Sequence, residues 1–210
     1  MSQLLVDRSE SAVFQGTWEQ RLEQVRQMML EMSLQTDPQA MVERYGTRVR
    51  KLMQYDGLVA VSRRGVAAPR YKITRSHLWG LDFDPWRNAD RLPVLQGGIL
   101  GQLLYAGLPK YLPELHVEPD DPAAEHLAGM GSLFAMPAYD AGKALNMTIL
   151  MRRQPDGFDR ERLPEQLWLS GLFGRVTHNL LLSRQLKEAY EAVDRELKLV
   201  GDIQRSLLPE

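Results

Sequence analysis

The segment SLFAMPAYDAGKALNMTILM, residues 132–151, decides the fold because it has the pattern of a β-hairpin. Residues 132–139 and 144–151 are mostly apolar, and each run is long enough to be a strand. Between them, Asp140-Ala-Gly-Lys143 supplies the small and glycine residues that a tight turn requires. The segment therefore predicts two adjacent antiparallel strands.

A second pair of strands is predicted upstream of this hairpin. Gly57–Ser62 is an apolar run rich in β-branched residues, Arg63–Gly65 has the composition of a turn, and Tyr71–Trp79 alternates like a returning strand. Residues 80–130, between the two pairs, are rich in Pro, Gly, Asp and Trp, with one short helical segment near Ile99–Tyr105. A connection of this length is uncommon, and it is usually functional or partly disordered.

Helices are predicted near the start of the chain. Thr17 and Gln20 have the spacing of a capping box, and Asp37-Pro38 opens a second helix that we expect to reach about Met53. Residues 1–16 lack periodicity and are expected to be a disordered N-terminus. Apolar residues of the first helix alternate at spacings of four and three, at Trp18, Leu22, Val25, Met29 and Met32.

The last helix is predicted from about Leu163 to Leu208, and it has the same spacing, which is the a/d seam of a coiled coil. Gly201 interrupts this helix, so we assign it as a candidate hinge. We expect a domain over residues 17–182 and a coiled-coil linker over residues 183–210. The apolar seam of this helix consists of Leu186, Tyr190, Val193, Leu197, Val200 and Leu207, with the polar Gln204 interrupting it.

The predicted order of elements favours an α+β fold with an antiparallel sheet, helices on one face and a long C-terminal coiled-coil helix. The first and last helices fall on the same side in this arrangement. We therefore expect their seams to form a homodimer interface.

Composition excludes several classes of function. The 210 residues carry a net charge of −1, so the chain lacks the basic face on which nucleic-acid binding usually depends. There is no cysteine, which excludes disulfides, thiolate metal sites and a cysteine nucleophile. No apolar run approaches the ~20 residues that cross a bilayer, and no signal peptide is recognised. We expect a cytoplasmic protein without nucleic-acid or membrane partners.

The sequence contains no recognisable catalytic or metal-binding set, so we expect this chain to be neither an enzyme nor a cofactor carrier. The four histidines have no partner at metal-ligand spacing. The carboxylates between Glu118 and Glu125 are interrupted by prolines, which favours a solvated loop leading into a short helix. Aromatic residues in or near the long connection could line a small ligand pocket or could simply fill the core. They are Trp79, Phe83, Trp86, Tyr105 and Tyr111.

The order of elements over residues 20–180 resembles a GAF domain, a small-ligand and dimerisation module of bacterial signalling proteins. The tail Arg195–Pro209, which ends in IQRSLLP, resembles the linker before the catalytic domain of sporulation stage II E-type (RsbU-like, PPM-fold) serine/threonine phosphatases. This second resemblance implies that a phosphatase domain, absent here, follows the linker. That domain would use Mn or Mg to dephosphorylate an anti-sigma-factor antagonist. The chain lacks the cyclic-nucleotide motif of some GAF domains and the chromophore cysteine of others.

These observations lead to one main hypothesis and two alternatives. The main hypothesis is a regulatory sensory and dimerisation domain that transmits the state of a ligand or partner through its C-terminal coiled coil to a phosphatase. One alternative is a purely structural dimerisation scaffold without a ligand. The other is the sensor of a different output, of the two-component type.

Overall fold

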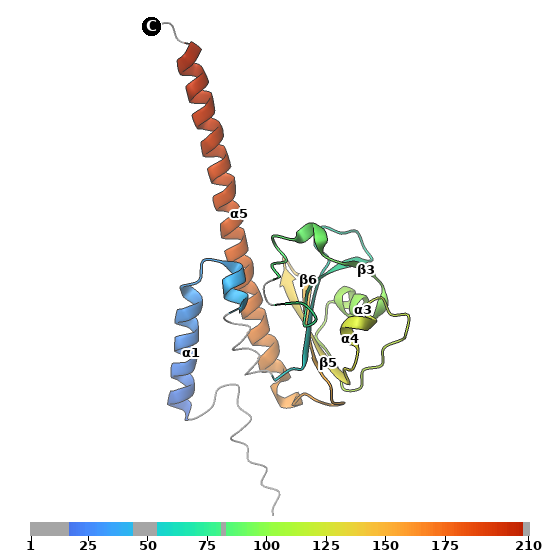
Figure 1. Ribbon diagram of the computed structural model, residues 1–210. Helices are drawn as coiled ribbons and strands as arrows, with labels where there is room; N and C mark the ends of the chain where they lie inside the picture. The colour runs from blue at the N-terminus through green and yellow to red at the C-terminus, as the bar shows by residue number, and fades with distance from the viewer. Residues whose placement is uncertain (1–16, 44–53, 81–82, 208–210) are drawn as a thin grey trace, which may run out of the picture.

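The computed structural model describes residues 17–43, 54–80 and 83–207, and it contains one antiparallel sheet with strand order β3-β2-β1-β6-β5-β4 (Figure 1). The strands are β1 Gly57–Ser62, β2 Arg70–Ser76, β3 Val94–Gln96, β4 Lys110–Leu112, β5 Ser132–Asp140 and β6 Lys143–Arg152. The helices are α1 Trp18–Ser33, α3 Gly98–Ala106, α4 Ala124–Leu127 and α5 Leu163–Leu207, with short 3-10 turns at Ala89–Arg91 and Arg160–Arg162. Residues 38–43 are also helical and are called the 38–43 helix below.

The predicted central hairpin is confirmed. Asp140 pairs with Lys143, and the two residues between them, Ala141 and Gly142, have φ angles of 47° and 76°. Two successive positive φ values are characteristic of the tight turn whose twist matches that of antiparallel strands. The upstream pair is confirmed as β1 and β2, although β2 ends at Ser76 and Trp79 lies beyond it.

The long connection contains more regular structure than the sequence predicted. It includes the expected helix, now α3, together with the short helix α4 and the two strands β3 and β4. Each of these strands has three residues and lies at one edge of the sheet. Three residues are too few to show an alternating pattern, so the sequence alone does not reveal them.

Both faces of the sheet are covered. On β5, Leu133 and Ala135 pack in one core with α3 and α4, whereas Phe134 and Met136 pack in a second core with α1 and α5. The α+β class, the antiparallel sheet and the long C-terminal helix are as predicted. The terminal helices lie together on one face, as expected, but α3 and α4 cover the opposite face (Figure 1).

Both predicted helix starts are confirmed. The Gln20 backbone N–H donates to Thr17 Oγ1 at 3.4 Å, and the Thr17 N–H donates to Gln20 Oε1 at 2.9 Å. Asp37 Oδ1 accepts the backbone N–H of Ala40 at 2.8 Å at the start of the 38–43 helix. The predictions for residues 1–16 and for the helix beyond residue 43 fall outside the described residues.

Candidate functional site

An irregularity in β2 controls which side chains reach each face of the sheet. Ala60 pairs with Arg75, but the next residue, Val61, pairs with Ile73, so Thr74 is an extra residue in β2. Such a β-bulge reverses the alternation of side chains that follow it. Arg75 therefore lies on the face covered by α1 and α5, and Ser76 lies with Val59 on the face covered by α3 and α4.

Ser76 forms a buried polar pair with a histidine of α4. Its Oγ lies 2.9 Å from His126 Nδ1 and accepts the backbone N–H of Leu78 at 3.2 Å. The other ring nitrogen of His126 lies 3.2 Å from the exposed carboxylate of Glu125. Burial lowers the pKa of His126, His77 lowers it further, and Glu125 opposes the change. The imidazole is therefore held neutral, in a form that can both donate and accept a hydrogen bond.

Two of the predicted aromatic residues lie against this pair. The Trp79 ring is 6.2 Å from His126, edge to face, and 4.9 Å from the Phe83 ring. Trp79 also packs against the core beneath α3 and α4. Apolar rings beside a few polar groups are the residue types that line small-molecule pockets, so these residues are candidates for such a site.

The same face contains a second buried polar feature, at the N-terminus of α3. Asp121 Oδ2 accepts the Ile99 N–H at 2.8 Å, and its Oδ1 accepts the Ala123 N–H at 2.8 Å. Tyr71 is fully buried and passes beneath Gly101, and its hydroxyl has no hydrogen-bond partner among the described residues. Burial raises the pKa of Tyr71, and the negative charge of Asp121 adds to this effect. A buried hydroxyl without a partner costs stability, so Tyr71 is a candidate contact for a ligand.

The other three predicted pocket residues lie elsewhere. Trp86 stacks on the guanidinium of Arg75, and Tyr105 stacks on that of Arg63 and donates its hydroxyl hydrogen to the Arg70 carbonyl. Tyr111 packs with Phe158 on the face covered by the terminal helices. The structure thus brings Trp79 and Phe83 together and does not bring Tyr111 to them.

Sequence reasoning missed Ser76, His126, Tyr71 and Asp121 as a group. Ser76 and His126 are 50 positions apart, and no spacing rule connects them. Asp121 belongs to the carboxylates that were predicted to form a solvated loop, and its side chain instead accepts from the N-terminus of α3, a contact across 22 positions. Among the described residues, no three His, Asp or Glu side chains gather as a metal site.

The predicted seam on α5 forms a second candidate surface. Its described members extend from the domain with exposed fractions between 50% for Val200 and 69% for Tyr190. α5 continues without a break through Gly201. On α1, Leu22 is exposed and Val25 is half-buried, whereas the side chains of Trp18 and Leu207 lie outside the described part. The exposed members on α5 are Leu186, Tyr190, Val193, Leu197 and Val200.

Solved structures resemble this architecture. The GAF domain of a phosphoenolpyruvate-protein phosphotransferase from Coxiella burnetii superposes with a TM-score of 0.56, covering 80% of this chain and 96% of that one at 14% identity. The GAF domain of the Acinetobacter phosphoenolpyruvate-protein phosphotransferase superposes with a TM-score of 0.55, covering 78% of this chain and 95% of that one at 15% identity. Residues 122 to 287 of a methyl-accepting chemotaxis protein superpose with a TM-score of 0.52, covering 77% of this chain and 98% of that one at 12% identity. The chain has the fold of a GAF domain.

At this identity the likeness establishes the fold alone. No protein-family model matches the chain, and no curated protein matches its sequence. Across the described residues, no helix of this GAF fold is both long enough and apolar enough to cross a membrane.

The unpartnered hydroxyl of Tyr71 leads to a stability prediction. We expect Tyr71→Phe to raise the free energy of unfolding by about 1 kcal/mol, because it removes a buried polar group that has no partner among the described residues. Tyr105→Phe is the matched control, and it should lower the free energy by about 1 kcal/mol because it removes the hydrogen bond to Arg70. Urea denaturation measures both changes. A Tyr71→Phe variant less stable than the parent would show that the hydroxyl has a structural partner.

The buried His126 leads to a pH prediction. The unfolded chain takes up a proton near the ordinary pKa of 6.5, whereas the folded chain resists protonation because its pKa is lowered. The free energy of unfolding is therefore expected to decrease as the pH falls below 6.5 toward the lowered folded pKa. When denaturation is measured from about pH 7.5 to 5.5, the free energy of unfolding should decrease less for His126→Gln than for the parent. His116→Gln, at an exposed histidine, should behave like the parent. Equal slopes for all three chains would contradict the prediction.

Proposed function

We propose that this chain is a regulatory sensory and dimerisation domain of a signalling protein. The observation that supports this most directly is the apolar seam of α5, which leaves the domain with its side chains exposed. An apolar stripe at coiled-coil spacing is stable in water only when a second helix covers it. The partner is a second copy of the chain, because the seam is self-complementary when two such helices lie parallel.

The sensory input is proposed to be a small molecule that binds on the sheet face beneath α3 and α4. This proposal rests on the unpartnered Tyr71 hydroxyl and on the neutral His126–Ser76 pair beside Trp79. A mainly apolar ligand with one or two hydrogen-bonding groups suits such a surface. The alternative is a purely structural scaffold without a ligand. The Tyr71→Phe variant distinguishes the two, because a gain in stability would indicate that the hydroxyl has a role other than folding and would favour the sensor.

The output is proposed to be a serine/threonine phosphatase domain downstream of Glu210. The support is the resemblance of the tail, residues 195–209, to the linker of the sporulation stage II E-type phosphatases. The Mn or Mg ion and all catalytic residues would belong to that domain, and its substrate would be a phosphorylated anti-sigma-factor antagonist. We propose no catalytic role, nucleic-acid partner or membrane partner for the chain itself.

The output proposal predicts that the coding sequence continues past Glu210 into an acidic, metal-binding domain. The longer protein should release phosphate from a phosphoserine protein only when Mn or Mg is present. The matched control is the same protein with EDTA, which should be inactive. A coding sequence that continues into a histidine kinase or another output would support the two-component alternative instead.

The seam predicts a dimer that one buried charge disrupts. We expect sedimentation equilibrium to give twice the 24.0 kDa mass of one chain. Leu197→Glu should weaken dimerisation by about 100-fold or more, because it places two unpaired carboxylates in the seam. Gln185→Glu adds the same charge just before the seam begins and should leave the dimer intact. A parent chain that is monomeric at micromolar concentration would contradict the dimer.

A further inference from the structure

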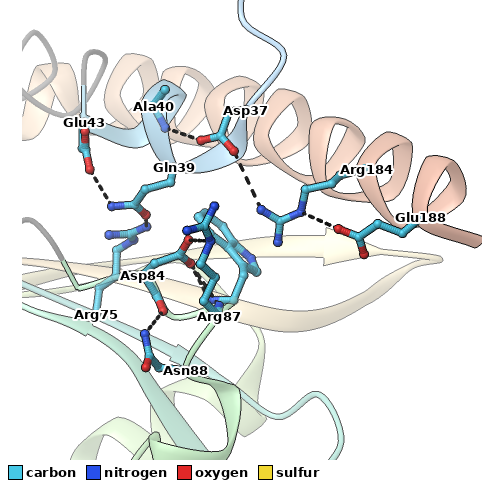
Figure 2. Close-up of polar contacts among 11 residues, drawn as sticks. Asp37, Gln39, Ala40, Glu43, Arg75, Asp84, Arg87, Asn88, Arg184 and Glu188 are labelled. Carbon is cyan, nitrogen blue, oxygen red and sulfur yellow. Dashed lines mark hydrogen bonds and ion pairs between the residues drawn. The ribbon is translucent and has the colours of Figure 1, made fainter. Parts of the chain in front are cut away.

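Arg75 lies where three parts of the molecule meet. Its guanidinium donates from Nη2 to Gln39 Oε1 of the 38–43 helix at 2.9 Å (Figure 2). It also lies over the Trp86 ring, 5.2 Å from the ring centroid. Burial lowers the pKa of Arg75, while the carboxylates of Asp84 and Glu43 counteract this effect. A cation removed from water in this way depends on the few groups that compensate it.

The segment that carries Trp86 is held in one shape by Asp84. The Asp84 carboxylate, which is largely buried, accepts the backbone N–H of Trp86 at 2.8 Å and that of Arg87 at 3.2 Å. The Asn88 side chain and backbone N–H both donate to the Asp84 carbonyl. These hydrogen bonds join Asp84 to residues 86–88, so the backbone that carries Trp86 is fixed in the turn that Asp84 closes.

The 38–43 helix connects Arg75 to α5. Gln39, which accepts from Arg75, also donates to Glu43 at 2.8 Å. At the start of the same helix, Asp37 lies 3.8 Å from Arg184 of α5, and Arg184 lies 3.6 Å from Glu188 (Figure 2). Both distances exceed that of a hydrogen bond. Arg184 thus lies between two carboxylates, in ion-pair contact with each and hydrogen-bonded to neither.

Arg75 and the segment 83–88 also adjoin residues on the α3–α4 face, where the ligand is proposed to bind. Ser76 follows Arg75 directly and pairs with His126 on the opposite side of the sheet. Phe83, whose ring packs at a tilt against Trp79 beside His126, immediately precedes Asp84. Residues 75–76 and 83–88 therefore contact the α3–α4 face at one end and the terminal-helix face at the other.

We propose that Arg75 is the coupling residue of this fold. Stacked on Trp86 and bonded to Gln39, it links the position of residues 83–88 to the Asp37–Arg184 contact that holds α5. The inference rests on the proposed sensory function. It adds the route by which a change beside Trp79 and His126 reaches the output helix.

Hydrogen exchange of the full chain tests this route without a ligand. In Trp86→Leu, amides of the 38–43 helix and of α5 around Arg184 should exchange at least about threefold faster than in the parent, while those of β5 and β6 keep their rates. The matched control is Tyr105→Leu, which removes another ring covered by an arginine at the same 5.2 Å, and it should leave both reporter segments unchanged.

A variant on α5 distinguishes coupling between the two sites from a general loss of stability in Trp86→Leu. Arg184→Gln changes α5 alone, yet it should accelerate exchange at residues 83–88, because coupling between two sites acts in both directions. In Trp86→Leu combined with Arg75→Met, exchange at the 38–43 helix should be no faster than in Trp86→Leu alone, since both changes break one link.

Uniform acceleration across the sheet, or additive effects in the double variant, would overturn the proposal and leave Arg75 a structural residue only. Neither result depends on a ligand or a dimer. A failure here is therefore distinct from a failure of the proposed function, which sedimentation and the downstream coding sequence test.

Discussion

The single extra residue in β2 is the constraint on which the rest of this molecule depends. With regular alternation, Arg75 would follow Tyr71 and Ile73 onto the apolar face beneath α3 and α4. Instead, Thr74 is the extra residue that shifts the pairing register. Its hydroxyl donates to the Ala60 carbonyl at 3.1 Å, which adds a polar contact at the bulge. The guanidinium therefore reaches Gln39 and Trp86, while Ser76 reaches His126. One irregularity places two polar side chains on two faces, each beside its partner.

Those parts of the fold that depend on local chemistry could be predicted from the sequence. The central hairpin has a glycine in its turn, and the capping box of Thr17 and Gln20 needs only four consecutive residues. The bulge could not be predicted, because Tyr71–Ser76 reads as an ordinary alternating strand and the extra residue is visible only against Ala60 and Val61. The edge strands β3 and β4 are formed by pairing with long strands rather than by their own three residues.

The candidate site was even less accessible to sequence reasoning. His126 and Ser76, or Asp121 and the α3 N-terminus, meet only because α3 and α4 fold over the same face of the sheet. The aromatic residues of the connection were the visible signal, and they divide among three environments, one of which is that of Tyr111 against Phe158. Trp79 and Phe83 pack beside His126, whereas Trp86 and Tyr105 each cover an arginine. A ring that covers a half-buried cation and a ring that lines a ligand surface are the same residue types, so only their neighbours distinguish them.

The position of Arg184 along α5 determines how the proposed coupling would act on the helix. Before this residue, α5 places Leu169 and Phe173 against the sheet, and after it the seam is exposed from Leu186 onward. The Asp37–Arg184 contact therefore lies where the helix leaves the domain. From Arg184 to Leu207 the helix extends roughly 35 Å at 1.5 Å per residue, so a tilt of about 5° at this point moves the far end by about 3 Å. A displacement of that size is comparable to the shift between neighbouring packing arrangements of two helices. In the proposed dimer, a small change at this long ion pair would therefore alter how the two seams meet.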